Sequence, residues 1–183
     1  KERIGVDVAE AAMIFELQKV GLNLVDGQQI MLDARELKNI DEVTLLNQAA
    51  SMVDGVYHMI YEELKPGVRE NDIVAKANKM LYEMGSDDVE AINAISGERC
   101  SPHPHNFTDR YFRPGDQAFF DILQSFVGYR TCYYRTFNIG KANNEQNDAY
   151  KQCREWLDKA IDLIKPGVST DKVASVWPKA EDF

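Results

Sequence analysis

The residues whose types could do chemistry gather first in one short run, GYRTCYYRT at residues 128–136. Its alternation is typical of a strand, but it is unusually polar and aromatic for a plain core strand. Arginine can bind a carboxylate through two parallel hydrogen bonds, although a solvated strand face explains Arg130 and Arg135 equally well. Cys132 could act as a nucleophile only with a lowered pKa. No CGxC-type context surrounds it, so the sequence favours a buried packing thiol.

Two of the three histidines lie in a second segment, the loop SPHPHNFTDR. Its prolines stiffen it, and loops set on a rigid scaffold often carry function. Histidine exchanges protons near neutral pH, so His103 and His105 are candidates for a general acid or base. A surface loop that happens to hold two histidines is the alternative. His58 falls in the middle of an expected helix, where a surface or packed role fits better.

Asp121 interrupts the apolar run QAFFDIL. A buried carboxylate without partners is costly, so this side chain must meet hydrogen-bond donors or a ligand. A purely structural role and a functional role are equally compatible with the position.

The elements that must position these residues follow from periodicity and turn signals. Apolar spacing predicts helices at 9–20, from an N-cap at Asp41 to Leu64, at 71–84 and at 144–164. Strands are predicted at 4–8, 91–96, 117–127 and 128–140, with the RPGD turn and the histidine-containing loop between them. Residues 22–27 and 28–38 are expected to be short extended pieces around a turn at Asp26-Gly27.

An internal repeat organises the chain. LKPGVRENDIVAKANKM begins at Leu64 and IKPGVSTDKVASVWPKA begins at Ile164, and each follows a long helix and precedes a shorter one. A unit of long helix, KPGV turn, short helix and strands is too long for a solenoid repeat. It indicates a half-domain duplicated about a pseudo-two-fold axis, with a site between the halves. Because KPG is a common helix stop, chance recurrence is the alternative.

Composition limits the possible partners. The 183 residues are 44% hydrophobic and 28% charged, as in ordinary globular proteins. The formal net charge of -9 argues against a nucleic-acid or anionic-membrane surface, and no apolar run is long enough to span a membrane. Three cysteines without a close-spaced motif suit reduced thiols in a cytoplasm, and the sequence has no CxxC or HxxxH metal spacing.

Together, the two KPGV units, the strand PGDQAFFD and the strand GYRTCYYRTF resemble the creatinase, aminopeptidase P and methionine aminopeptidase superfamily. The resemblance implies an α+β pita-bread fold of duplicated half-units, with the second half truncated. Residues 1–40 resemble the tail of the smaller N-terminal domain of the creatinase and prolidase branch. Residues 41–183 resemble the first half and the start of the second half of the catalytic domain. Both ends look cut, so we expect a piece of a longer protein.

The metallopeptidases of this superfamily read roughly GDLVLIDFGxxxxGYRSDxTRTF where this chain reads GDQAFFDILQSFVGYRTCYYRTF. The match needs no gap. Asp121 falls on the first metal-binding Asp, and Cys132 stands where the second would be. Two-metal hydrolases hold their cations with bridging carboxylates, and cysteine cannot bridge through two oxygens. The resemblance therefore implies loss of the dinuclear metal site.

Creatinase is the metal-free precedent in this superfamily, and His105-Asn106 is similar to the segment that carries its catalytic histidine. Creatinase holds its cationic substrate with a Glu at the position of Tyr134, and a neutral phenol cannot pair with a guanidinium in that way. The resemblance implies a metal-independent hydrolase of a C–N bond in a small molecule. His105 would be the general acid or base, with His103 second, and the substrate-binding residues would be Asp121, Arg130, Cys132 and Tyr134.

Two alternatives stay open. One is an Xaa-Pro aminopeptidase or prolidase-like enzyme with a reduced site for Mn, Co or Zn, in which Asp121 would be a ligand. The other is a non-catalytic binding protein on the same fold. The expected partners are a small molecule or dipeptide and, by analogy, a second copy in a homodimer, without nucleic acid or membrane. The expected location is the cytoplasm.

Overall fold

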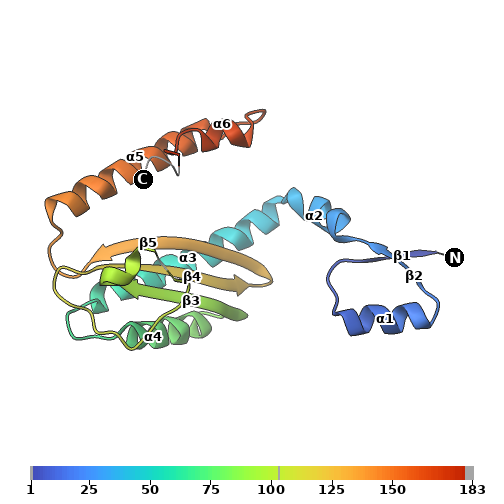
Figure 1. Ribbon diagram of the computed structural model, residues 1–183, viewed down its shortest axis with the longest axis horizontal. Helices are drawn as coiled ribbons and strands as arrows, with labels where there is room; N and C mark the ends of the chain where they lie inside the picture. The colour runs from blue at the N-terminus through green and yellow to red at the C-terminus, as the bar shows by residue number, and fades with distance from the viewer. Residues whose placement is uncertain (1, 103, 180–183) are drawn as a thin grey trace.

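A computed structural model describes residues 2–102 and 104–179 (Figure 1). In chain order the elements are β1 (Arg3–Val6), α1 (Ala11–Lys19), β2 (Asn23–Asp26), α2 (Gln28–Glu36), α3 (Ile40–Glu63), α4 (Glu70–Glu83), β3 (Asp88–Ser96), the 3-10 helix η1 (Gly97–Cys100), β4 (Gln117–Phe126), β5 (Tyr129–Asn138), α5 (Asn144–Leu163) and α6 (Thr170–Ala174). With the exception of residues 28–38, the predicted helices and strands are present, with bounds shifted by at most three residues.

The sheet β3-β4-β5 is antiparallel throughout and has two unlike faces. Helices α3 and α4 pack on one face (Figure 1). Side chains alternate along a strand, so Phe120 and Ile122, both 0% exposed, point into the core while Asp121 between them points away from it. The buried core includes Val53, Val56, Tyr57, Ile60, Ile73, Val74, Ala77, Leu81, Ile92, Ala94, Phe112, Ala118, Phe120, Ile122 and Ile139.

Helix α3 begins at a capping box. Its N-cap is Asn39 rather than the expected Asp41, because the Asn39 side chain accepts hydrogen bonds from the backbone N–H of Asp41 (2.9 Å) and of Glu42 (3.0 Å). The Glu42 carboxylate accepts in return from the backbone N–H of Asn39 (2.7 Å). The tyrosine Tyr57 on this helix ties it to the sheet, since its hydroxyl donates to the backbone carbonyls of Phe120 and Tyr133.

The segment after β2 is a helix, so the prediction of an extended piece at 28–38 was wrong. Gln28–Glu36 is composed mainly of residues that favour helices, and its start is stabilised by Asp26, whose carboxylate accepts from the backbone N–H of Gln28 (2.9 Å). Side-chain bonds at helical spacing support it further, such as Gln29 to Asp33 (2.7 Å). The turn at Asp26-Gly27 is present as predicted.

The two KPGV motifs share one backbone geometry. Leu64 has φ -75° and ψ 94°, and Ile164 has φ -73° and ψ 97°. The glycines that follow, Gly67 and Gly167, have φ 87° and 86°, a left-handed conformation that favours glycine. The repeat therefore recurs in backbone geometry, and α5–α6 stands in the second copy where α3–α4 stands in the first.

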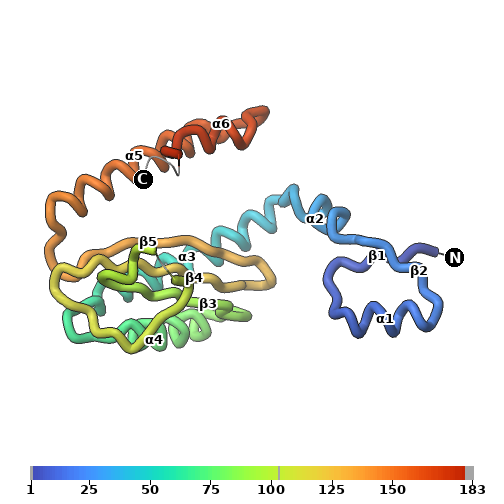
Figure 2. Tube along the Cα trace, in the orientation of Figure 1, coloured from blue at the N-terminus to red at the C-terminus, as the bar shows by residue number. Residues whose placement is uncertain are grey.

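Three parts of the molecule can be distinguished in the path of the chain. Figure 2 shows β1, α1 and β2 at one end, the sheet with α3 and α4 at the other, and α5 leading away from the sheet after β5. Strands β1 and β2 pair in parallel and form a small sheet of their own.

Within the described part of the chain, none of the helices is both long and apolar enough to cross a bilayer.

Candidate active site

Asp121 lies on the face of the sheet that α3 and α4 leave open, yet it is only 1% exposed. Directly across from it in register stand Asn93 on β3 and Tyr134 on β5. The Asn93 amide Nδ2 donates to Asp121 Oδ2 (3.1 Å), and the Cys132 thiol donates to Asp121 Oδ1 (3.4 Å). The expectation that this carboxylate needs partners is met by side chains from both neighbouring strands.

Cys132 is exposed, so the prediction of a buried packing thiol was wrong. Its side chain is on the open face of β5, beside Asp121, and not on the face that packs against α3. Partial burial of the sulfur raises the pKa of Cys132, and the negative charge of Asp121 and the hydrogen bond to it raise that pKa further. The thiol is therefore protonated at neutral pH and serves as a hydrogen-bond donor, which is a poor state for a nucleophile.

Tyr134 forms the rim of the same site. Its ring lies 6.2 Å from the ring of Phe119, and the residue is 45% exposed. The pKa of Tyr134 is raised by burial first, and then by the charge of Asp121 and hydrogen bonding to it. The phenol therefore stays neutral and offers one O–H to the carboxylate or to a bound molecule.

The two arginines that border Cys132 lie in different places. Arg130 is on the open side of β5, where its Nε is 2.6 Å from Glu90 Oε1. Arg135 lies over the ring of Tyr133, 4.7 Å from its centroid. Arg135 is thus stacked on the helix side of the strand, whereas Arg130 is beside the site but already paired with a carboxylate.

The histidine loop, residues 104–109, runs beside β3. The carbonyl of Asn106 accepts from the backbone N–H of Ala94 (3.0 Å), the residue that follows the Asp121 partner Asn93. His105 is exposed and directly precedes Asn106. His103 lies outside the described residues. The loop is thereby anchored next to the row formed by Asn93, Asp121 and Tyr134. His58 is an exposed residue of α3, as expected.

Two residues at the site were missed from sequence. Asn93 and Glu90 both lie in β3, where the sequence shows only a short, mostly apolar strand. A register shift at Glu90, between Val89 and Ala91, decides which β3 side chains face Asp121. The polar Asn93 inside AINAIS was the one available signal, and it could be used only once the pairing of β3 with β4 was known.

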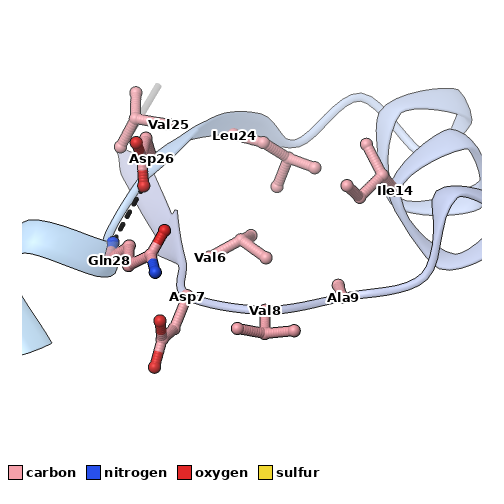
Figure 3. A pocket seen from close by; sticks show the side chains of 9 residues that line it. All are labelled: Val6, Asp7, Val8, Ala9, Ile14, Leu24, Val25, Asp26 and Gln28. Carbon is pink, nitrogen blue, oxygen red and sulfur yellow. Dashed lines mark hydrogen bonds between the residues drawn. The ribbon is translucent and has the colours of Figure 1, made fainter. Parts of the chain in front are cut away.

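A hollow of about 500 Å³ lies among β1, α1, β2 and the start of α2, which together are called the N-terminal unit (Figure 3). Its polar side chains are few, and the Asp26 carboxylate already accepts from the backbone N–H of Gln28. The hollow does not coincide with the Asp121 site. It is lined by Val6, Asp7, Val8, Ala9, Ile14, Leu24, Val25, Asp26 and Gln28.

Comparison with known families decides the wider assignment. The family described as Metallopeptidase family M24 matches residues 44–180, which is 137 of the 183 residues. The chain belongs to metallopeptidase family M24. This M24 chain carries Asp121 and Cys132 within the matched range.

Relatives and solved structures agree with that assignment. The Xaa-Pro dipeptidase of Pyrococcus furiosus is 23% identical over 179 residues, covering 96% of this chain and 51% of the relative. An uncharacterised hydrolase/peptidase of Sinorhizobium fredii is 23% identical over 97% of this chain and 47% of its own length. The prolidase structure from Pyrococcus furiosus superposes with a TM-score of 0.88 at 21% identity, covering 96% of this chain and 53% of that one. An X-Pro aminopeptidase from Thermotoga maritima gives 0.86 at 17% identity, covering 96% and 51%.

These matches show the fold. The M24 chain has the α+β pita-bread architecture expected from the KPGV repeat and the paired strands. It spans about half the length of the relatives it matches.

The family description implies a bound metal, and a metal site requires several donor side chains gathered in one place. Among the described residues, no three His, Cys, Asp or Glu side chains gather closely enough to hold an ion. Asp121 is the carboxylate at the centre of the site, and its nearest potential ligands are the sulfur of Cys132 and the amide of Asn93. A two-metal site needs carboxylates that bridge both ions. The residues present therefore do not fit a carboxylate-bridged metal pair.

Proposed function

We propose that the full-length protein is a hydrolase that cleaves an amide C–N bond, with a substrate of the Xaa-Pro dipeptide type. The names of the relatives support the peptidase, which was the alternative in the sequence analysis, better than the creatinase-like hydrolase. The observation that carries the proposal is the placement of Asp121, an almost fully buried carboxylate at the centre of the open sheet face of an M24 chain. A buried carboxylate aimed at an open face is placed to fix a polar group of a bound molecule.

His105 is the proposed general acid or base. Its loop is hydrogen-bonded to β3 next to Asn93, and histidine is the side chain that serves most often as a general acid or base. Tyr134 offers a neutral donor to the substrate from the neighbouring strand, whereas the Cys132 thiol already donates to Asp121. Arg130 could bind a substrate carboxylate only by sharing or breaking its ion pair with Glu90, so its role is at the rim.

A second candidate has its own observation in the site. Two hydrogen bonds, from Asn93 and from Cys132, already satisfy the Asp121 carboxylate with neutral donors. That arrangement favours a metal-independent hydrolase of a C–N bond, although none of the named relatives supports a creatinase-like activity.

Metal analysis of the full-length protein separates the two candidates. The protein would be purified, its Mn, Co and Zn content measured, and hydrolysis followed on Xaa-Pro dipeptides and on guanidino and ureido compounds. Dipeptide hydrolysis that a chelator abolishes and added metal restores supports the peptidase. Hydrolysis that is indifferent to chelation, with far less than one equivalent of metal, supports the second candidate. Tight binding without turnover of any compound contradicts both and leaves a binding protein.

A pair of histidine variants tests the role of His105. His105→Ala should lower kcat by about 100-fold or more, the range typical for loss of a general acid or base. His58→Ala is the matched control, because His58 is an exposed histidine on α3 away from the site and its loss should leave kcat unchanged. Retention of activity in His105→Ala would remove His105 from the mechanism.

A further inference from the structure

Glu70 is the most deeply buried acidic residue outside the site. It is the first residue of α4, separated from the first KPGV motif by Arg69 alone, and it is 0% exposed. A buried carboxylate persists only when charge and hydrogen bonds compensate it. Its Oε1 accepts from the Ser96 hydroxyl (2.7 Å), and its Oε2 accepts from Arg99 Nη1 (2.7 Å). Glu70 therefore ties the start of α4 to the end of β3 and to η1.

The same carboxylate also holds the histidine loop. Glu70 Oε2 accepts from the backbone N–H of Thr108 (2.9 Å) and from its hydroxyl (2.7 Å). The backbone of α4 adds a bond from the N–H of Asn71 to the carbonyl of Thr108 (3.1 Å). One end of the loop is thus fixed at Thr108 by two hydrogen bonds to the buried Glu70 carboxylate and by one to the backbone of α4.

Arg99 extends this hold to the neighbour of His105. One guanidinium nitrogen, Nη1, bonds Glu70, and the other, Nη2, donates to Asn106 Oδ1 (2.6 Å). Asn106 is also bonded through its carbonyl to Ala94. Asn106 is therefore held from both sides, and His105 precedes it with no intervening residue.

We propose that Glu70 is a positioning residue: acting through Arg99 and Thr108, it keeps the histidine loop against β3 so that His105 stays beside the Asp121 row. This inference rests on the proposed catalytic role of His105. It assigns a task to a residue that lies outside the Asp121 row. It also links the KPGV turn, which sets where α4 begins, to the geometry of the active site.

Hydrogen exchange and kinetics on the full-length protein test this role. In Glu70→Gln, amide exchange in residues 104–109 should rise about tenfold or more, while exchange in β4, residues 117–126, stays within about twofold. With Xaa-Pro dipeptide as substrate, kcat should fall about 10- to 100-fold with KM changed by less than about threefold, since misplacement of a catalytic group affects mainly the chemical step. Glu63→Gln is the matched control, a glutamate of α3 whose exposed ion pair with Lys76 does not touch the loop.

Thr108→Val provides the second variant if Glu70→Gln does not fold. Valine keeps the shape of threonine and removes the hydroxyl, which donates to Glu70 and accepts from Arg99 Nη1 and from the Arg110 backbone N–H. Thr108→Ser keeps this hydroxyl and should restore wild-type values. Unchanged exchange in the loop, or an equal rise in β4, overturns the proposal. Faster amide exchange in residues 104–109 without a loss of kcat would show that Glu70 holds the loop but that this does not matter for catalysis, which also overturns the proposal. If the wild-type protein hydrolyses none of the test compounds, the proposed function fails, and the exchange data still decide whether Glu70 holds the loop.

Discussion

At the residue scale, Cys132 and Asp121 define what the site can hold. The sulfur lies 3.4 Å from the carboxylate oxygen and donates a hydrogen bond to it. An aspartate at 132 would bring a second negative charge to the same place. Two carboxylates that close together repel unless a cation or a proton lies between them.

The variant Cys132→Asp should therefore create a site that depends on metal. In the full-length protein we expect the metal-free variant to melt below the wild type. Added Mn²⁺ or Zn²⁺ should raise its Tm more than that of the wild type, because a ligand that binds only the folded state stabilises it. Calorimetry with and without metal measures both effects.

Cys153→Asp is the control, because it replaces an exposed thiol on α5 away from Asp121. An equal response of the wild type and Cys132→Asp to metal would show that the thiol does not limit metal binding.

The chemistry of single residues was partly readable from sequence. Asp121 could be placed because a lone carboxylate in an apolar strand is conspicuous and its spacing to position 132 matches a family motif. The exposure of Cys132 could not be predicted from sequence, since it depends on which face of β5 the helices cover. Asn93 and Glu90 were hidden by the irregular pairing of β3, which no local pattern reveals.

At the element scale, the Asn39 cap at the start of α3 makes a measurable contribution to stability. Asn39→Ala removes the side chain that caps the helix and should lower the free energy of unfolding by about 1 kcal/mol. Urea denaturation of the full-length protein measures the change. Asn47→Ala, in the exposed middle of the same helix, should leave stability the same or slightly higher. Equal losses in both variants would contradict the capping role.

The ion pair of Arg110 with Asp116, in the loop before β4, makes the stability of the folded protein depend on pH. Both side chains are nearly buried and bond twice, at 2.6 Å and 3.2 Å. Burial alone would raise the pKa of Asp116. The hydrogen bonds from the Arg110 side chain and the Arg113 backbone N–H, together with the positive charges of the Arg110 and Arg113 side chains, lower this pKa below its ordinary value of 3.8. A carboxylate with a lowered folded-state pKa stabilises the protein above the unfolded value, and this stabilisation is lost as pH falls through the folded value.

Asp116→Asn should therefore be less stable than the wild type at pH 6, and the difference should shrink as pH falls below 3.8. Urea midpoints at pH 6, 4 and 3 give the comparison. Asp148→Asn, in an exposed pair on α5, should differ little from the wild type at any of these values. A constant difference for Asp116→Asn across this range would contradict the assignment.

The long helices and the paired strands were easier to predict from sequence than the short helix α2. Periodicity found the long helices and the paired strands because their apolar faces are extensive. The helix Gln28–Glu36 was missed because its apolar residues Ile30, Met31 and Leu32 are consecutive and do not recur at helical spacing.

At the scale of the whole molecule, the N-terminal unit is joined to the rest of the chain through an exposed connection. Leu37 is 87% exposed and Lys38 is also exposed, between the end of α2 and the cap of α3. The predicted domain boundary after residue 40 falls next to this connection. Exposed connections are the preferred sites of proteolytic cleavage.

Brief digestion of the full-length protein with trypsin should therefore cut after Lys38 and release a fragment that begins at Asn39. Mass spectrometry of the early products identifies the cut. Lys38→Gln should remove this product while leaving digestion elsewhere unchanged. First cuts within the segment 97–116, or within α3, would show that the boundary lies elsewhere.

The pleat of β4 and β5 has a consequence for how this fold can change over evolutionary time. Phe120 and Ile122 hold the core from one face, whereas Asp121 and its row occupy the other. Residues of that row can be exchanged without removing any core side chain, because adjacent positions on a strand never share a face. On these two strands a change within the Asp121 row leaves the core side chains in place. A thiol in place of a carboxylate at 132 is therefore compatible with the same fold.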